Sequence, residues 1–65
     1  MDFSYYSLYL KKYLVDTDDP RKDVDDFIVS RAELAEMEYE DVRRAGASVD
    51  VAQENAMSVL MEGMN

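Results

Sequence analysis

The sequence contains no cysteine and no histidine. Without cysteine the chain can form no disulfide, no thiolate nucleophile and no cysteine-ligated metal site, and without histidine it lacks the commonest general base and metal ligand. A chain of 65 residues is also too short for a buried catalytic chamber, because a single core of this size leaves only about 3–5 kcal/mol of net stability. We therefore expect a protein that is not an enzyme and that uses no cofactor.

Basic residues are scarce as well: seven Lys and Arg stand against fifteen Asp and Glu, which gives a formal charge of −8. Nucleic acids and anionic membranes both attract clusters of basic residues, so this balance disfavours direct binding to either. No apolar run approaches the roughly 18 residues of a membrane span, and the first residues, Met1 to Ser4, are acidic rather than basic. We expect a cytoplasmic protein.

Glycine and proline are rare, with two and one residues, while 48% of the chain is hydrophobic. This composition is too rich in apolar residues for a disordered tail and predicts one folded domain over residues 1–65. No segment alternates with a period of two for long enough to predict a strand. Apolar residues instead recur at helical spacing, which predicts an all-α, compact three-helix bundle with helices near 3–15, 23–45 and 48–62.

Residues at the expected breaks support these boundaries. The Asp-rich segment 16–19 and Pro20 end the first helix, and Gly46 fits the left-handed position after the second. Ser48 can cap the third helix, and Gly63 can end it. We expect the first two helices to form a hairpin and the third to pack across them. The expected core-facing positions are Phe3, Tyr6, Tyr9, Leu10, Tyr13 and Leu14, then Val24, Ile28, Ala32, Ala35, Tyr39 and Val42, then Val49, Ala52, Ala56, Val59 and Leu60.

Several short motifs follow one another along the chain. They are Ser4-Tyr5-Tyr6 before a Leu/Tyr helix, Asp26-Phe27-Ile28 followed by Arg31-Ala32, a helix closing at Ala45-Gly46, and Ala52 to Ala56 followed by Val59-Leu60 and Gly63. This order resembles the N-terminal half of a small all-helical family of unknown function, encoded on conjugative transposons and related mobile elements of Bacteroidetes. The resemblance implies a bacterial, cytoplasmic mobile-element protein. It carries over no catalytic or ligand-binding residue.

Two groups of carboxylates are candidates for metal binding. If an EF-hand loop began at Asp16, Arg21 would replace its required glycine and Phe27 its bidentate carboxylate. Glu33, Glu36 and Glu40 share one helix face, but a helical di-metal site also needs a histidine and further carboxylate-bearing helices. We interpret the loop as a solvated helix stop and the glutamates as a solvated face with weak salt bridges, such as Glu40 to Arg44.

Arg31 and Glu38 lie within the broad apolar arc of the second predicted helix. Arg31 can extend past the core to pair with a carboxylate of the loop 16–19 or with a tyrosine hydroxyl. The alternative is that Arg31 contacts a partner or a small anion. Both interpretations stay open at the level of sequence.

The chain carries more large apolar residues than one stripe per helix can bury. The surplus predicts an association surface, because tyrosine and exposed apolar patches are typical of interfaces, and scattered exposed hydrophobics are the alternative. Three methionines, Met57, Met61 and Met64, add an adaptable edge to the third helix. The predicted partner-binding residues are Tyr5, Leu8, Val15, Phe27, Arg31 and Leu34.

These observations favour a non-enzymatic protein–protein interaction module. Its partner would be another protein or a second copy of the chain, with a homodimer expected because extra burial stabilises so small a domain. The alternative is an acidic antagonist that imitates the phosphates of DNA and occupies a basic nucleic-acid-binding site. A phosphate mimic needs acids in spaced rows over one face, whereas a docking module needs an apolar patch rimmed by charge.

Overall fold

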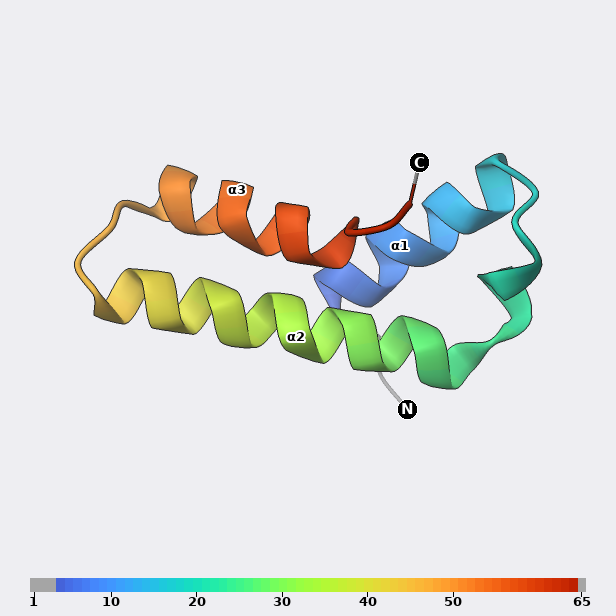
Figure 1. Cartoon of the computed structure of the whole chain (residues 1–65), viewed down its shortest axis with the longest axis horizontal. Helices are drawn as coiled ribbons and strands as arrows, with labels where there is room; N and C mark the ends of the chain where they lie inside the picture. The colour runs from blue at the N-terminus through green and yellow to red at the C-terminus, as the bar shows by residue number, and fades with distance from the viewer. Residues whose placement is uncertain (1–3, 65) are drawn as a thin grey trace.

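The computed structural model describes residues 4–64, and this range contains three α-helices, one short 3-10 helix and no strand (Figure 1). The helices are α1 (Tyr5–Asp16), α2 (Asp25–Arg44) and α3 (Val49–Leu60), and the 3-10 helix η1 (Pro20–Asp23) lies between α1 and α2. The all-α, three-helix prediction is confirmed. None of the described helices is long and apolar enough to cross a membrane.

The predicted ends at Gly46 and Ser48 are present, and Ser4, for which no capping role was predicted, caps α1. The Ser4 and Ser48 side chains cap α1 and α3 by accepting hydrogen bonds from the backbone N–H groups of Ser7 and Val51, each at 3.3 Å. Gly46 has φ +102°, a conformation that only glycine adopts without strain. The helices α1 and α3 therefore begin where a serine side chain satisfies a free backbone N–H group, whereas α2 begins after Val24, which makes no capping hydrogen bond through its side chain.

The connection between α1 and α2 is more ordered than predicted. Asp19 caps η1 by accepting from the backbone N–H of Arg21 at 2.8 Å, and Pro20 occupies the first position, where its missing N–H costs nothing. Because η1 ends at Asp23, α2 begins at Asp25 rather than near 23. The first turn of α2 still holds two acids and its last turn two arginines, which suits the helix dipole.

The closest pair of helices is α2 and α3, not α1 and α2. Figure 1 shows α2 and α3 running antiparallel along most of the molecule, with α1 lying obliquely across the half that contains the start of α2 and the end of α3. Small buried residues explain the close pairing, since alanine lets two helix backbones approach. These residues are Ala32 and Ala35 on α2 and Ala52 and Ala56 on α3.

The core lies where all three helices meet. Its buried members are Tyr6, Leu10, Leu14, Ile28, Ala32, Ala35, Ala56, Leu60 and Met64. Three residues expected to face the core, Tyr9, Val24 and Val49, are exposed, while Phe3 lies outside the described residues. Val24 and Val49 sit at helix starts, beyond the reach of the neighbouring helices. The three methionines of the C-terminal segment also differ from expectation, because Met64 is buried and Met57 and Met61 pack against the core.

Candidate interaction surface

The side of α1 that faces away from the other helices carries large apolar side chains. Tyr5, Leu8 and Val15 are 62%, 57% and 50% exposed, and Tyr9 is 43% exposed. The structure thus brings three of the predicted partner-binding residues together on one exposed face. We call Tyr5, Leu8, Tyr9, Lys12, Val15 and Asp16 the outer face of α1.

Aromatic contacts hold the start of this face in place. The Tyr5 ring packs edge-on against the Tyr6 ring with centroids 5.5 Å apart, and it lies 6.4 Å from the Tyr9 ring. Tyr6 is buried, so the exposed Tyr5 ring rests on a fixed base, and the Tyr9 ring lies beside Tyr5. The outer face therefore presents its aromatic groups in a defined arrangement.

A shallow hollow of about 260 Å³ opens on the outer face. Tyr9, Lys12, Tyr13 and Asp16 line it. Their spacing is i, i+3, i+4 and i+7, the four positions that form the hole for a side chain of a facing helix in knobs-into-holes packing. The spacing of these four residues is visible in the sequence, but Tyr9 and Tyr13 were expected to face the core, so the hollow was not predicted.

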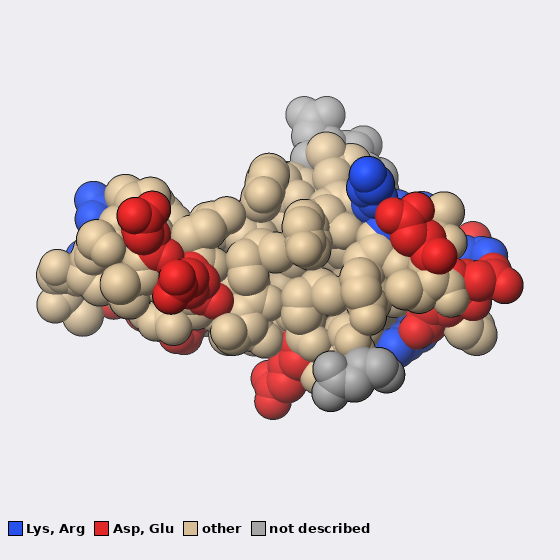
Figure 2. Space-filling model, turned by 90° about the horizontal axis from the view of Figure 1, so that it is seen from above, with Lys and Arg blue, Asp and Glu red and all other residues tan. Residues whose placement is uncertain are grey.

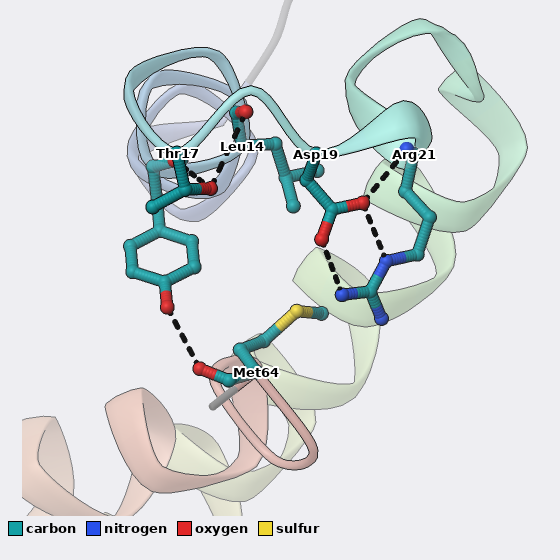
Figure 3. A network of polar contacts seen from close by, with 6 residues as sticks. Leu14, Thr17, Asp19, Arg21 and Met64 are labelled. Atoms are coloured by element: carbon teal, nitrogen blue, oxygen red, sulfur yellow. Dashed lines mark hydrogen bonds and ion pairs between the residues drawn. The ribbon is translucent and has the colours of Figure 1, made fainter.

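Long-range hydrogen bonds fix α1 against the rest of the molecule. The Tyr6 hydroxyl donates to Oε1 of Gln53 at 3.0 Å, and the Tyr13 hydroxyl donates to the backbone carbonyl of Met64 at 2.7 Å (Figure 3). Burial, followed by the nearby Tyr39, Tyr5 and Glu36, raises the pKa of Tyr6. The Tyr6 hydroxyl therefore stays protonated and able to donate.

The other three predicted partner-binding residues lie on α2. Phe27 is half-buried and packs against the core, with the Arg21 and Arg31 guanidinium groups 5.2 and 5.6 Å from the centre of its ring. Leu34 is 50% exposed. These two cations cover part of Phe27, which leaves Leu34 as the largest exposed apolar group of this trio.

Arg31 contacts neither the loop 16–19 nor a tyrosine hydroxyl. It donates to the carbonyl of Val59 at 3.4 Å and lies 3.9 Å from the carboxylate of Glu62, so it joins α2 to the end of α3. In the loop 16–19, the carboxylate of Asp19 pairs with Arg21 instead. Glu38, the second polar residue in the apolar arc of α2, is half-buried.

The six predicted residues thus form two separate surfaces. Tyr6 of α1 lies near Glu36 of α2. Leu34 and Glu36 are two residues apart, so they point in nearly opposite directions around α2, at about 100° per residue. Leu34 therefore faces away from α1, and it cannot contribute to the outer face.

The acidic loop after α1 is held by its own basic neighbours. Both carboxylate oxygens of Asp19 accept from the Arg21 guanidinium, at 2.6 and 2.9 Å (Figure 3). Asp18 pairs with Lys22 at 2.6 Å. Hydrogen bonds from the Arg21 side chain and backbone lower the pKa of Asp19 to about 2. Within residues 4–64 no three carboxylates are placed to hold a metal ion together.

Charge is unevenly distributed over the molecule. Seen from above, acidic and basic side chains gather toward both ends of the molecule, and most of the surface between them carries neither (Figure 2). On α2, Arg44 pairs with Asp41 at 3.4 Å rather than with Glu40.

Comparison with known proteins returns one match. No curated protein and no solved structure matches the chain. Residues 1–65, the whole chain, match the model of a family described as a domain of unknown function. The chain therefore belongs to the DUF1896 family.

Proposed function

We propose that this protein is a non-enzymatic interaction module that binds another protein chain through the outer face of α1. The observation that carries the proposal is the exposure of four large apolar side chains, Tyr5, Leu8, Tyr9 and Val15, on one side of one helix. The sequence resemblance supports a bacterial mobile element as its setting and the cytoplasm as its compartment.

The chemistry of this face favours a protein partner. Contiguous apolar patches rimmed by charge are typical of protein–protein contacts, and tyrosine is enriched at the centres of such interfaces. On the outer face the apolar side chains surround two charged groups, Lys12 and Asp16, so charge lies within this face as well as around it. Burying its apolar atoms would stabilise a complex by about 25 cal/mol for each Å² removed from water, before the costs of association.

The proposal is tested by capture with two matched variants. The full chain and the variants Leu8→Glu and Leu34→Glu are each immobilised and exposed to lysate of the native host. Leu8 and Leu34 are similarly exposed, but only Leu8 lies on the outer face. We expect the bound protein to be lost with Leu8→Glu and kept with Leu34→Glu, while circular dichroism shows equal helix content. Loss with Leu34→Glu alone would move the binding surface to α2.

The second candidate function is the acidic antagonist that imitates DNA. The observation that favours it is a row of exposed acids on one side of α2: Asp26, Glu33 and Glu40, at seven-residue intervals. The row is sparse, because successive acids seven residues apart are separated by about 10 Å along the helix axis. Replacement of Glu33 and Glu40 by Lys would abolish binding to a basic nucleic-acid-binding protein, whereas Leu8→Glu would leave that binding intact.

A further inference from the structure

We propose that the partner of the outer face is a second copy of this chain, bound in an antiparallel α1–α1 contact in which Tyr5 of each copy enters the hollow of the other. This inference rests on the proposed function and names the partner. It assigns a role to the hollow lined by Tyr9, Lys12, Tyr13 and Asp16.

The first argument is shape. At 100° per residue, Tyr5 lies about 40° from Tyr9 and about 20° from Asp16 around the axis of α1, so the protruding ring and the hollow share one strip of the helix. A two-fold axis perpendicular to α1 places this strip against its own copy in the opposite direction. Each Tyr5 then faces the hollow of the other copy, and both contacts form at once.

The second argument is chemistry. The rings of Tyr9 and Tyr13 form apolar walls, and Lys12 and Asp16 supply a cation and a carboxylate at the rim. A tyrosine suits such a hollow, because its ring packs on the walls while its hydroxyl reaches a polar group. Within residues 4–64, neither Lys12 nor Asp16 takes part in an ion pair, so both can accept a new partner.

The third argument is charge. The whole chain has a formal charge of −8, but α1 carries Lys11, Lys12 and Asp16, which gives a helix charge of 2 − 1 = +1. A contact between two α1 helices therefore brings no concentration of acids together. Most acids lie on α2 and α3, outside the proposed contact. A second copy therefore meets less repulsion on the outer face than on the acid-rich α2.

The size of the contact sets its strength. A standard interface buries about 800 Å² on each partner, which would be nearly a fifth of the 4462 Å² surface of this chain. One face of a 12-residue helix, about 18 Å long, buries less than that. We therefore expect a weak dimer whose population rises with protein concentration.

The absence of cysteine makes the test direct, because a single introduced cysteine reports only its own position. Leu8 lies near the proposed two-fold axis, so the two copies of Leu8→Cys come close and form a disulfide under mild oxidation. Val15→Cys places its thiols at opposite ends of the antiparallel pair and should cross-link at least fivefold more slowly. Leu34→Cys, on the other surface, is the matched control and should be equally slow.

Each other outcome overturns the inference. Fast cross-linking of both Leu8→Cys and Val15→Cys would indicate a parallel pair, and fast cross-linking of Leu34→Cys would indicate a different interface. Adding Tyr5→Ala to Leu8→Cys should slow disulfide cross-linking to the rate of Val15→Cys. If the double variant cross-links as fast as Leu8→Cys alone, Tyr5 does not fill the hollow. A wild-type chain that sediments as a monomer at high concentration in moderate salt would reject the dimer. The capture experiment with Leu8→Glu would still decide the proposed function.

Discussion

The Tyr13 hydroxyl donates a hydrogen bond to the backbone carbonyl of Met64 across 51 positions of the chain. The contact ties the last described turn of the chain to the first helix (Figure 3). Met64 is buried, so little water can reach its carbonyl, and the Tyr13 hydroxyl supplies a hydrogen-bond donor in place of water. One phenolic group thereby satisfies a backbone acceptor and closes the C-terminal end of the core.

Replacing Tyr13 with Phe should destabilise the fold by about 0.5–1.5 kcal/mol, because the ring stays and only the hydrogen bond is lost. Urea denaturation of dilute protein measures this difference. Tyr9→Phe is the control, since the Tyr9 ring is exposed and its hydroxyl makes no hydrogen bond within residues 4–64. An equal effect of the two substitutions would show that the bond to Met64 contributes nothing.

Leu10→Ala should cost about 2–5 kcal/mol, because Leu10 is fully buried in the core and truncation leaves a cavity. That loss is comparable with the whole stability of a domain of this size, about 3–5 kcal/mol, so the variant should be largely unfolded at 37 °C. Leu8→Ala removes the same atoms from an exposed site and should change stability by less than about 0.5 kcal/mol. Thermal melts by circular dichroism compare the two.

Asp19 should titrate near pH 2, because hydrogen bonds from Arg21 stabilise its ionised form. The folded pKa is lower than the ordinary value of 3.8, so the contribution of this carboxylate to stability is present above pH 3.8 and is lost as the pH falls toward 2. NMR titration of the side-chain carboxyl measures the pKa directly. Arg21→Gln should raise it toward 3.8, whereas Lys22→Gln should act on Asp18 instead.

Self-association should tighten as salt is added. Two chains of formal charge −8 repel each other, and the screening length falls from about 30 Å at 0.01 M salt to about 10 Å at 0.1 M. Sedimentation equilibrium should show the dimer dissociation constant falling several-fold over this range. A variant with Asp50→Asn and Glu54→Gln, both exposed on α3, should respond less. Weaker association at 0.1 M would indicate that ion pairs hold the dimer.

The elements that depend on local chemistry were predictable from the sequence. Gly46 and Ser48 each act on backbone groups within a few residues, so their types and positions were enough to place helix ends. The Ser4 cap and the 3-10 helix were not predicted, although their signals are local too. Asp19 before Pro20 is the pattern of a capped helix start as well as of a helix stop.

Tertiary placement decided the rest. A helical wheel places Tyr9 at the edge of the apolar stripe, but α1 crosses its neighbours obliquely and leaves that edge exposed. Arg31 finds its partners on α3, 28 positions away for Val59, and no spacing within α2 could indicate them. Of the candidate site, Tyr5, Leu8 and Val15 were predictable from the sequence. Tyr9 was expected in the core, and the hollow depends on how α1 packs against its neighbours.

The oblique position of α1 has a consequence for the order in which the molecule assembles. The α2–α3 pair is joined by the short turn 45–48 and makes the most extensive contacts between helices, so these contacts can form early. The helix α1 makes fewer contacts with α2, and its hydrogen bonds to Gln53 and Met64 span 47 and 51 positions. We expect α1 to be the last element to fold and its amides to exchange with solvent first. Because the outer face belongs to this helix, partner binding and the final folding step would stabilise the same segment, and a bound partner would slow amide exchange in α1 more than in α2 or α3.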